Sequence, residues 1–407
     1  MNKDAVYIIS GGFVRSVAVS LIGVTYGLYV AFLGLSPFKL GILIASGLIG
    51  MAVATFVVLM WGDKIGRRKS LIILSVLCAL GGIATAFSIE MSAFLISAFV
   101  GMINGMGRDR GAAAALDQAM LASVVTDQSR TKFFAVHSFA QDIGHAAGSA
   151  LAVFPIILQN WLHLTERGGY QGTIIIYAGV ILLSGLFALK ISRKAEPEQV
   201  NKRFQLAPET RKRVLKISTL FGIDALGSGC LTGALIAYYF HERYGIGVAE
   251  ISGIIAAARI ANALSHFVAA WIAGKIGLIR TMVFTHLPSH LLLVAMAFMP
   301  EFWMAAILYL IQESLVEMDV PTRNSYVMAI IQPSERTAVA GITQMVRVAG
   351  WGLAPIAAGA LMGRVSLMMP LFMGAGIKSI YDLGLYFNFR KVPAPEETEK
   401  INGGGQS

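Results

Sequence analysis

The stretch Trp61-Gly62-Asp63-Lys64-Ile65-Gly66-Arg67-Arg68-Lys69-Ser70-Leu71 places four basic side chains between two long apolar runs. A weaker copy, Ala273-Gly274-Lys275-Ile276-Gly277-Leu278-Ile279-Arg280, lies about half a chain later, again between apolar runs. Short basic loops between apolar runs are typical of the cytoplasmic side of multi-pass membrane proteins. The two copies therefore predict a membrane protein that is internally duplicated.

The composition supports a membrane protein. Of the 407 residues, 56% are hydrophobic and only 14% are charged, whereas soluble domains have roughly 25% charged residues. The apolar runs reach the roughly 20 residues that a helix needs to cross hydrocarbon, and they lack the alternation of barrel strands. The net charge of +10 is explained by basic residues beside membrane spans, so no nucleic-acid partner is expected.

The apolar runs predict an all-α integral membrane fold with twelve transmembrane helices. The fourth and tenth runs continue for about 30 residues, so each is expected to be one long helix that projects into the cytoplasm. The first run begins after only Lys3 and Asp4 and is too long for a signal-peptide core, so it is expected to be retained. The runs lie near residues 7–33, 41–61, 71–88, 93–125, 133–158, 173–189, 217–240, 248–273, 282–299, 302–331, 338–362 and 367–387.

One polar stretch divides six runs from six. Residues 1–190 are predicted to form an N-terminal six-helix bundle, 191–213 a cytoplasmic linker, 214–390 a C-terminal six-helix bundle and 391–407 a disordered cytoplasmic tail. Lysine and arginine concentrate on the side that holds the linker, and the other side receives only Lys39, Arg167, Arg243 and Arg364. The positive-inside rule then predicts that both termini are cytoplasmic. The expected location is the plasma (cytoplasmic) membrane, the inner membrane of a cell with two.

The two halves align beyond the basic loops. Ser129-Arg130-Thr131 after the fourth run matches Glu335-Arg336-Thr337 after the tenth, at an offset of 206. Nearly the same offset places Arg15 on Asp224 in the first and seventh runs. Matches in the same helix of each half indicate two pseudo-symmetric bundles that arose by duplication.

With these features the chain resembles the major facilitator superfamily over essentially its whole length. The motif of that family between its second and third spans, G-x-L-x-D-R/K-x-G-R-R/K, is matched here by Asp63, Lys64, Gly66, Arg67 and Arg68, while Leu59 stands at the leading glycine. The resemblance implies a secondary transporter built from two six-helix bundles. It also implies that Asp63 stabilises the outward-open state and that the basic residues cap cytoplasmic helix ends.

Charged side chains inside a membrane are costly, so each is a candidate for a pore, a gate or a partner. Arg15 and Asp224 occupy corresponding places with opposite sign. Arg15 is predicted to bind an anionic group of the substrate, and Asp224 to pair with Arg15 or carry a coupling proton. A second pair of opposite sign, Asp142 and Arg347, has the same two readings. For both pairs a purely structural buried ion pair is the alternative.

Other charges lie in the fourth and tenth runs. They predict a gate in which arginines of the first half meet acids of the second when the cytoplasmic side closes, with Arg110 and Asp117 on one helix face. The alternative is local charge pairing, such as Asp319 with Arg323 four residues apart. The gating candidates are Arg108, Arg110, Asp117, Glu313, Glu317 and Arg323, together with Asp63, Gly66, Arg67 and Arg68 of the basic loop.

Two histidine pairs complete the candidates. His137 and His145 lie near one helix face and are read as a proton relay or as packing and hydrogen-bonding residues. His286 and His290 have the i,i+4 spacing that can bind a metal, but no third ligand lies nearby in the sequence. No metal site, cofactor or catalytic residue is therefore predicted.

The sequence thus favours a transporter, not an enzyme, that moves a small polar solute by alternating access with protons as coupling ion. No G-x-x-x-x-G-K-[ST] motif is present, which disfavours ATP hydrolysis. The expected partners are the solute, membrane lipids and protons, and the expected state is a monomer. The alternatives are a transporter-like sensor or scaffold, and an intramembrane enzyme.

Overall fold

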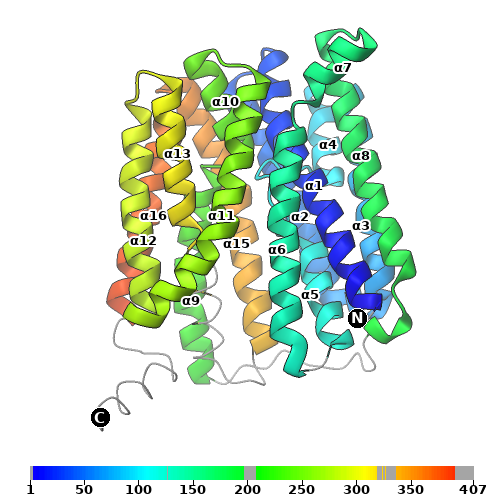
Figure 1. The fold of residues 1–407 in the computed structure, drawn as a ribbon, viewed down its shortest axis with the longest axis vertical. Helices are drawn as coiled ribbons and strands as arrows, with labels where there is room; N and C mark the ends of the chain where they lie inside the picture. Colours follow the sequence, from blue (N-terminus) through cyan, green and yellow to red (C-terminus); the bar gives the residue numbers. More distant parts are fainter. Residues whose placement is uncertain are drawn as a thin grey trace. The chain divides into compact units, whose positions relative to one another are not determined.

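The computed structural model describes residues 3–125, 127–196, 208–318, 323, 326 and 336–389, and every regular element within them is helical (Figure 1). The predicted all-α class is confirmed. The α-helices are α1 Lys3–Phe32, α2 Pro37–Ile65, α3 Arg67–Phe87, α4 Met91–Gly101, α5 Ala112–Val124, α6 Asp127–Leu151, α7 Phe154–Leu162, α8 Glu166–Lys190, α9 Pro208–Gly229, α10 Gly233–Tyr244, α11 Val248–Ile276, α12 Leu278–Ala297, α13 Phe302–Val316, α15 Arg336–Arg364 and α16 Met369–Phe389, and a 3₁₀ helix, η1, spans Arg193–Ala195.

Eight of the twelve predicted runs form one helix each: α1, α2, α3, α8, α11, α12, α15 and α16. The fourth, fifth and seventh runs are interrupted, giving α4–α5, α6–α7 and α9–α10. By length and composition, eight segments of the described chain can cross a membrane, or nine if α6 and α7, bent by 43°, form one span. The tenth run forms α13 only to Val316, and its predicted continuation lies outside the described residues apart from positions 323 and 326.

Burial follows the pattern of a membrane protein. Large apolar side chains such as Phe267, Leu291 and Phe387 are at least 66% exposed, as expected for surfaces that face lipid. Charged side chains such as Asp117 and Asp224 are at most 2% exposed. An ionised group in the interior needs a partner, so these buried charges mark the candidate functional sites of the protein.

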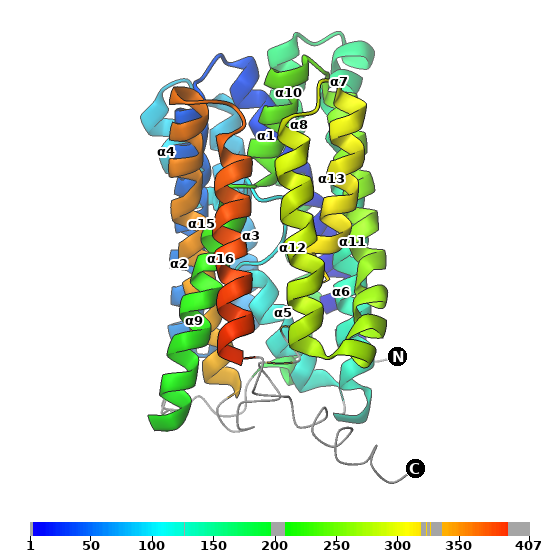
Figure 2. The ribbon, with the colours of Figure 1, turned by 90° about the vertical axis from the view of Figure 1, so that its left-hand side faces the viewer.

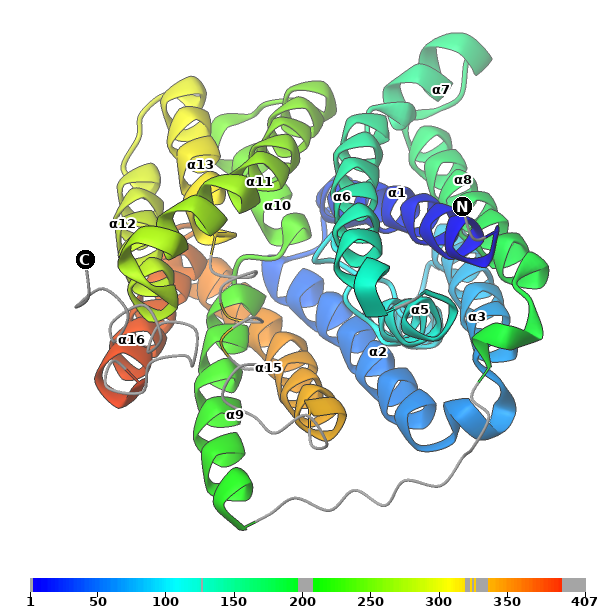
Figure 3. The ribbon, with the colours of Figure 1, turned by 60° about the horizontal axis from the view of Figure 1, so that its bottom comes forward.

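Contacts divide the chain into two compact units, and each is described by itself. The first comprises residues 1–202, 229–260 and 351–370. Within it α1 lies between α6 and α8 (Figure 3). The approach of α1 to α6 is close because Gly148 lacks a side chain, and a Cβ there would lie 2.1 Å from the carbonyl oxygen of Val17. Small residues permit such helix contacts inside membranes.

The second unit comprises residues 203–228, 261–350 and 371–407. Within it α12 runs beside α13 (Figure 2). Its apolar core joins α9, α12, α15 and α16 through side chains that include Phe221, Met282, Val339 and Tyr381. Both α11 and α15 contribute residues to each unit, so the division into bundles of residues 1–190 and 214–390 stays a prediction.

The fourth run is not the continuous helix that we predicted from its hydropathy. It is interrupted over residues 102–111, because Met102 ends α4 in the left-handed conformation, with φ of 49°. Asn104 then satisfies the irregular backbone: its Oδ1 accepts the N–H of Met106 at 2.9 Å, and its Nδ2 donates to the carbonyl of Arg108 at 2.5 Å. Glycine and asparagine favour such turns over helix, and hydropathy does not register this preference.

The interruption also contacts the rest of the first unit. The N–H of Ala234, at the start of α10, donates to the carbonyl of Gly105 at 2.9 Å. Gly107 has φ of 70°, and its Cα lies so close to α1 that a Cβ on Gly23 would be 2.3 Å away. Non-helical backbone is tolerated at membrane depth where it is buried in protein, as it is here.

The substitution Gly23→Ala is therefore expected to destabilise the protein. The added methyl group would meet backbone rather than a movable side chain, and overpacking of this kind costs about 1–3 kcal/mol. Gly179→Ala in α8 is the matched control, because an added Cβ there meets nothing within 4 Å. Thermal unfolding in detergent should separate the two variants, and equal unfolding temperatures would contradict the close approach of α1 to residue 107.

Candidate functional site

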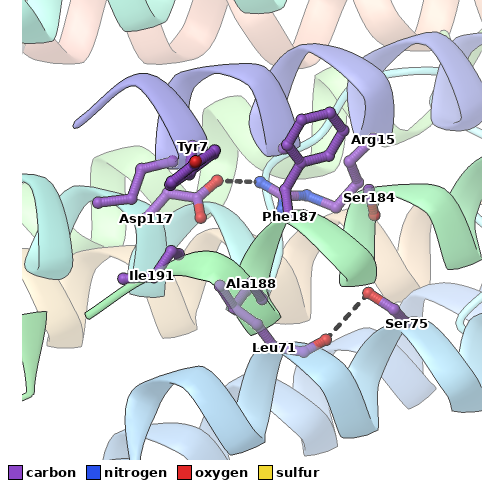
Figure 4. Close-up of a pocket in the computed structure, with 11 residues that line it drawn as sticks. Tyr7, Arg15, Leu71, Ser75, Asp117, Ser184, Phe187, Ala188 and Ile191 are labelled. Carbon is purple, nitrogen blue, oxygen red and sulfur yellow. Dashed lines mark hydrogen bonds and ion pairs between the residues drawn. The ribbon is translucent and has the colours of Figure 1, made fainter. Parts of the chain in front are cut away.

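Arg15, buried in α1, lies between two carboxylates of the same unit. Its Nε donates to Asp109 Oδ2 at 2.6 Å, and its Nη2 donates to Asp117 Oδ2. Figure 4 shows the Arg15–Asp117 contact. Asp109 comes from the interruption after α4, and Asp117 comes from α5. We call these three residues the Arg15 cluster; with both carboxylates ionised, it has one negative charge in excess.

Two histidines of α6 border the Arg15 cluster. His137 Nε2 lies 3.6 Å from Asp117 Oδ2, and His145 Nε2 accepts the backbone N–H of Asp109 at 3.0 Å. A neutral imidazole accepts only at the nitrogen that has no proton. His145 therefore keeps its proton on Nδ1, the atom 3.9 Å from Asp142 Oδ1. The predicted histidine pair thus contacts the cluster from one helix, at a carboxylate and at a backbone amide.

A small pocket opens beside the Arg15 cluster. Its volume of about 10 Å³ is close to the space that one water molecule needs. Arg15 and Asp117 line it together with the side chains of Ser75 and Ser184 from α3 and α8 (Figure 4). A water molecule in this pocket would lie within reach of the Asp117 carboxylate.

Asp224 of α9 holds a second cluster, in the other unit. Lys378 Nζ donates to Asp224 Oδ1 at 2.7 Å and to Ser228 Oγ at 3.0 Å. Arg323 Nη1 donates to Asp224 Oδ2 at 3.3 Å, and Arg347 Nη2 lies 3.8 Å from the same oxygen. Asp224, Arg323, Arg347 and Lys378 are all buried. This Asp224 cluster therefore gathers three cations around one carboxylate.

The structure places the predicted substrate residues with partners from their own units. Arg15 contacts Asp109 and Asp117, while Asp224 contacts Lys378 and two arginines. Likewise, Asp142 lies beside His145 and Arg347 beside Asp224. Pairing between the two halves, as proposed for Arg15 with Asp224 and for Asp142 with Arg347, stays a prediction.

The sequence identified Asp109 and Lys378 as costly charges inside apolar runs, each a candidate for a pore, a gate or a partner, but it did not place them in these clusters. The repeat alignment gave neither of them a partner, so no role followed from the sequence.

The gating candidates are dispersed. Arg110 belongs to the interruption, so the expectation that it shares a helix face with Asp117 is wrong; its Cζ lies 5.6 Å from the centre of the Trp351 ring. Arg108 belongs to the same interruption. Glu313 Oε2 accepts a hydrogen bond from Asn262 at 3.1 Å, and Glu317 follows the last turn of α13.

The proposed pairing of Arg323 with Asp319 lies outside the described residues, because position 319 does. Arg323 itself contacts Asp224. A gate between the two halves stays a prediction.

The basic loop between α2 and α3 contacts two neighbouring helices, and Arg68 caps the end of one of them, as the resemblance to the family motif implied for the basic residues. Gly66, with φ of 100°, lets the chain turn from α2 into α3. Arg67 donates to the carbonyl of Ala119 in α5, and Arg68 donates to the carbonyls of residues 188 and 189 at the end of α8. Asp63, with a half-exposed side chain, pairs with Arg67 at 2.8 Å.

Glu196, which we did not single out from the sequence, binds the start of α3 next to this loop. Its carboxylate accepts the backbone N–H groups of Arg67 and Arg68 at 2.7 and 3.1 Å. These are the first amides of α3, a helix whose N-cap glycine offers no side chain. An anion at a helix N-terminus satisfies orphan donors and interacts favourably with the helix dipole.

Glu196→Gln is expected to lower the free energy of unfolding by about 0.5–2 kcal/mol, the range for loss of an N-cap. Glu90→Gln is the matched control, because Glu90 precedes α4 without a side-chain cap hydrogen bond. Proteolysis within residues 191–213 should accelerate in the first variant alone, since Glu196 ties that segment to α3. Equal cleavage rates in both variants would show that this contact does not hold the segment.

Comparison with solved structures places the fold among transporters. A bacterial homolog of the human lysosomal transporter Spinster, in an inward-facing and occupied conformation, matches with a TM-score of 0.76 and 14% identity over 95% of this chain and 96% of its own. A point mutant of the nucleoside transporter NupG matches with a TM-score of 0.74 and 14% identity, over 95% of this chain and 99% of its own. The xylose transporter XylE from E. coli, in an inward-open conformation, matches with a TM-score of 0.71 and 17% identity, over 98% of each chain.

Comparison of sequences agrees. The uncharacterized membrane protein YJR124C of Saccharomyces cerevisiae is 22% identical over an alignment of 427 positions, which covers 97% of this chain and 95% of that protein. The profile of the Major Facilitator Superfamily matches residues 8–355, and a second match spans 217–406. With its helical fold and the basic loop at residues 61–71, the chain belongs to the major facilitator superfamily of membrane transporters.

Proposed function

We propose that this protein is a secondary active transporter that moves a small polar solute by alternating access, with protons as the coupling ion. The observation that supports it best is the presence of two buried ionic clusters of opposite charge balance. The Arg15 cluster has an excess carboxylate, and the Asp224 cluster has an excess of cations. Buried charges inside transporters mark substrate and proton sites.

The two clusters suit different ligands. A proton shared by Asp117 and His137 would neutralise the excess charge of the Arg15 cluster, and the adjacent pocket would supply it through water. The cations of the Asp224 cluster would bind an anionic or strongly polar group of the solute. NupG and XylE, two proteins of similar fold, are named for polar solutes, a nucleoside and xylose.

Alternating access supplies the mechanism. Bundles of residues 1–190 and 214–390 would rock about a central site, with a linker at 191–213. Asp63 and the basic loop would stabilise one state, and the charges of the fourth and tenth runs would close the cytoplasmic side. Both termini would be cytoplasmic, the chain would be a monomer in the plasma membrane, and it would carry out no catalysis.

Uptake into proteoliposomes tests the proposal. Radiolabelled nucleosides, sugars, amino acids and small carboxylates are offered in turn under an imposed pH gradient, while a dye inside the vesicles reports pH. One class should accumulate with proton movement, and Asp117→Asn should separate solute movement from proton movement. Failure of every class would overturn transport, and accumulation that survives collapse of the pH gradient would overturn proton coupling.

A further inference from the structure

A separate buried cluster in the second unit is used by neither proposed ligand site. His286 and His290 lie one turn apart on α12, and both contact Asp382 of α16. His286 Nδ1 is 3.0 Å from Oδ1 of the carboxylate, and His290 Nε2 is 2.8 Å from Oδ2. The three side chains are at most 3% exposed, and their ligand atoms lie within 4.8 Å of one another.

The hydrogen bonds of His286 leave a lone pair facing the carboxylate. Its Nε2 lies 2.9 Å from the carbonyl oxygen of Val316. A carbonyl can only accept, so Nε2 carries the proton. In the neutral ring Nδ1 is then without a proton, yet it faces Asp382 Oδ1 at 3.0 Å. Two acceptors at this distance repel unless a cation lies between them.

His290 repeats the arrangement. Ser289 Oγ donates its proton to the carbonyl of His286 at 2.7 Å, so the same oxygen is left to accept from His290 Nδ1, 3.4 Å away. With its proton on Nδ1, the neutral His290 ring presents a lone pair on Nε2 to Asp382 Oδ2. In this tautomer of His290, both contacts of the carboxylate need a proton or a metal ion between the two partners.

We propose that His286 Nδ1, His290 Nε2 and the Asp382 carboxylate bind one divalent transition-metal ion of the zinc class. Two imidazolium rings would repel, since their centroids are only 5.2 Å apart, whereas a single divalent ion replaces both protons. Two imidazole nitrogens and one carboxylate suit zinc, cobalt or nickel rather than calcium or magnesium. Three protein ligands leave one tetrahedral position for water.

The surroundings support a metal site. Metal-binding histidines usually donate their other N–H to a carbonyl or a similar acceptor, which fixes the ring. His286 does this with Val316 of α13, and His290 faces Ser289. The ion would join α12 to α16, on which Lys378 contacts Asp224 one turn before Asp382. It would thereby hold α16, and with it Lys378, in place at the Asp224 cluster.

The test uses the full chain, purified in detergent through an affinity tag without histidines and stripped with EDTA. Zinc is titrated against a chromophoric chelator, and cobalt is followed by its visible absorption. One ion per chain is expected. His290→Gln and Asp382→Asn should each weaken zinc binding by more than about 100-fold. His163→Gln, an exposed histidine after α7, is the matched control and should bind like the wild type.

The outcomes decide between a metal and protons. Absence of zinc and cobalt binding by the wild type would overturn the proposal and leave the triad held by protons, and so would binding that both variants retain. If the variants fail to fold, the wild type still decides the matter. Zinc, and not calcium, must raise its unfolding temperature in a concentration-dependent way, and no rise with zinc would overturn the proposal whatever the transport assay shows.

Discussion

Arg15→Gln is expected to lower the stability of the protein strongly and to abolish transport. The substitution leaves Asp109 and Asp117 in the interior without the guanidinium that binds both of them. Removal of one partner of a buried ion pair costs about 3–5 kcal/mol, because the remaining charge keeps its desolvation penalty. Thermal unfolding in detergent and uptake into proteoliposomes measure the two effects.

A double variant separates charge from shape at this cluster. In Arg15→Gln with Asp117→Asn, one of the two uncompensated carboxylates is gone, so part of the lost stability should return. The coupling between the two substitutions should fall in the range of about 0.5–3 kcal/mol that contacting residues show. Proton-coupled accumulation of the solute should not return, because the double variant also lacks the proposed proton site.

Lys39→Gln is the control for this cycle, since Lys39 is an exposed cation at the start of α2. It should change the free energy of unfolding by less than about 0.5 kcal/mol. If the losses in Arg15→Gln and Asp117→Asn simply add, the two side chains do not interact, and the Arg15 cluster is not the ion triplet described above.

Much of the fold could be predicted from the sequence because its elements depend on local properties. The apolar run over 41–61 became α2, and the glycine at 66 marked the turn into α3, since positive φ favours glycine. The role of Arg68 as a helix cap followed from resemblance to a motif whose residues stand next to one another in the sequence.

The interruption at 102–111 could not be predicted by the same means. Hydropathy averages over a window, so Ile103 and Met106 outweighed the turn signals of Asn104 and Gly107. The signals were nevertheless present in the sequence, because asparagine and glycine compete with helix formation wherever their backbone finds other partners. Here those partners are the side chain of Asn104 and the N–H of Ala234.

The partners of buried charges depend on contacts between distant residues. Asp382 is 92 residues from His290, so the spacing of the two histidines gave no sign of it. The repeat alignment set Arg15 over Asp224, and both are buried charges inside helices, but an alignment relates equivalent positions and does not identify contacts. Lys378 lies 154 residues from Asp224, and only packing of α16 against α9 brings the two together.

Asp224→Asn is expected to be the second severely destabilising change. It leaves Arg323, Arg347 and Lys378 close together without the carboxylate that all three approach. Loss of one partner from a buried ionic cluster again costs about 3–5 kcal/mol. A second substitution, Lys378→Met, should restore part of this stability in the Asp224→Asn background, because it removes one of the mutually repelling cations while keeping much of the apolar stem.

The three cations that remain in Asp224→Asn make this variant a test of whether the solute carries an anionic group. An anion that binds among the three cations should raise the unfolding temperature of Asp224→Asn more than that of the wild type, where Asp224 competes for the same groups. Small carboxylates and phosphates are the probes, each tested at matched ionic strength since salt screens such interactions. Equal shifts in both proteins would show that anions do not bind at this cluster.

Asp63→Asn supplies the stability control for the Asp224 variant. Asp63 also pairs with an arginine, but its side chain is 48% exposed, and exposed ion pairs contribute only about 0–1 kcal/mol. Both substitutions remove one carboxylate charge and keep its shape. A large loss in Asp224→Asn beside a small loss in Asp63→Asn would therefore trace the effect to burial, whereas similar losses would mean that the Asp224 cluster is in contact with water.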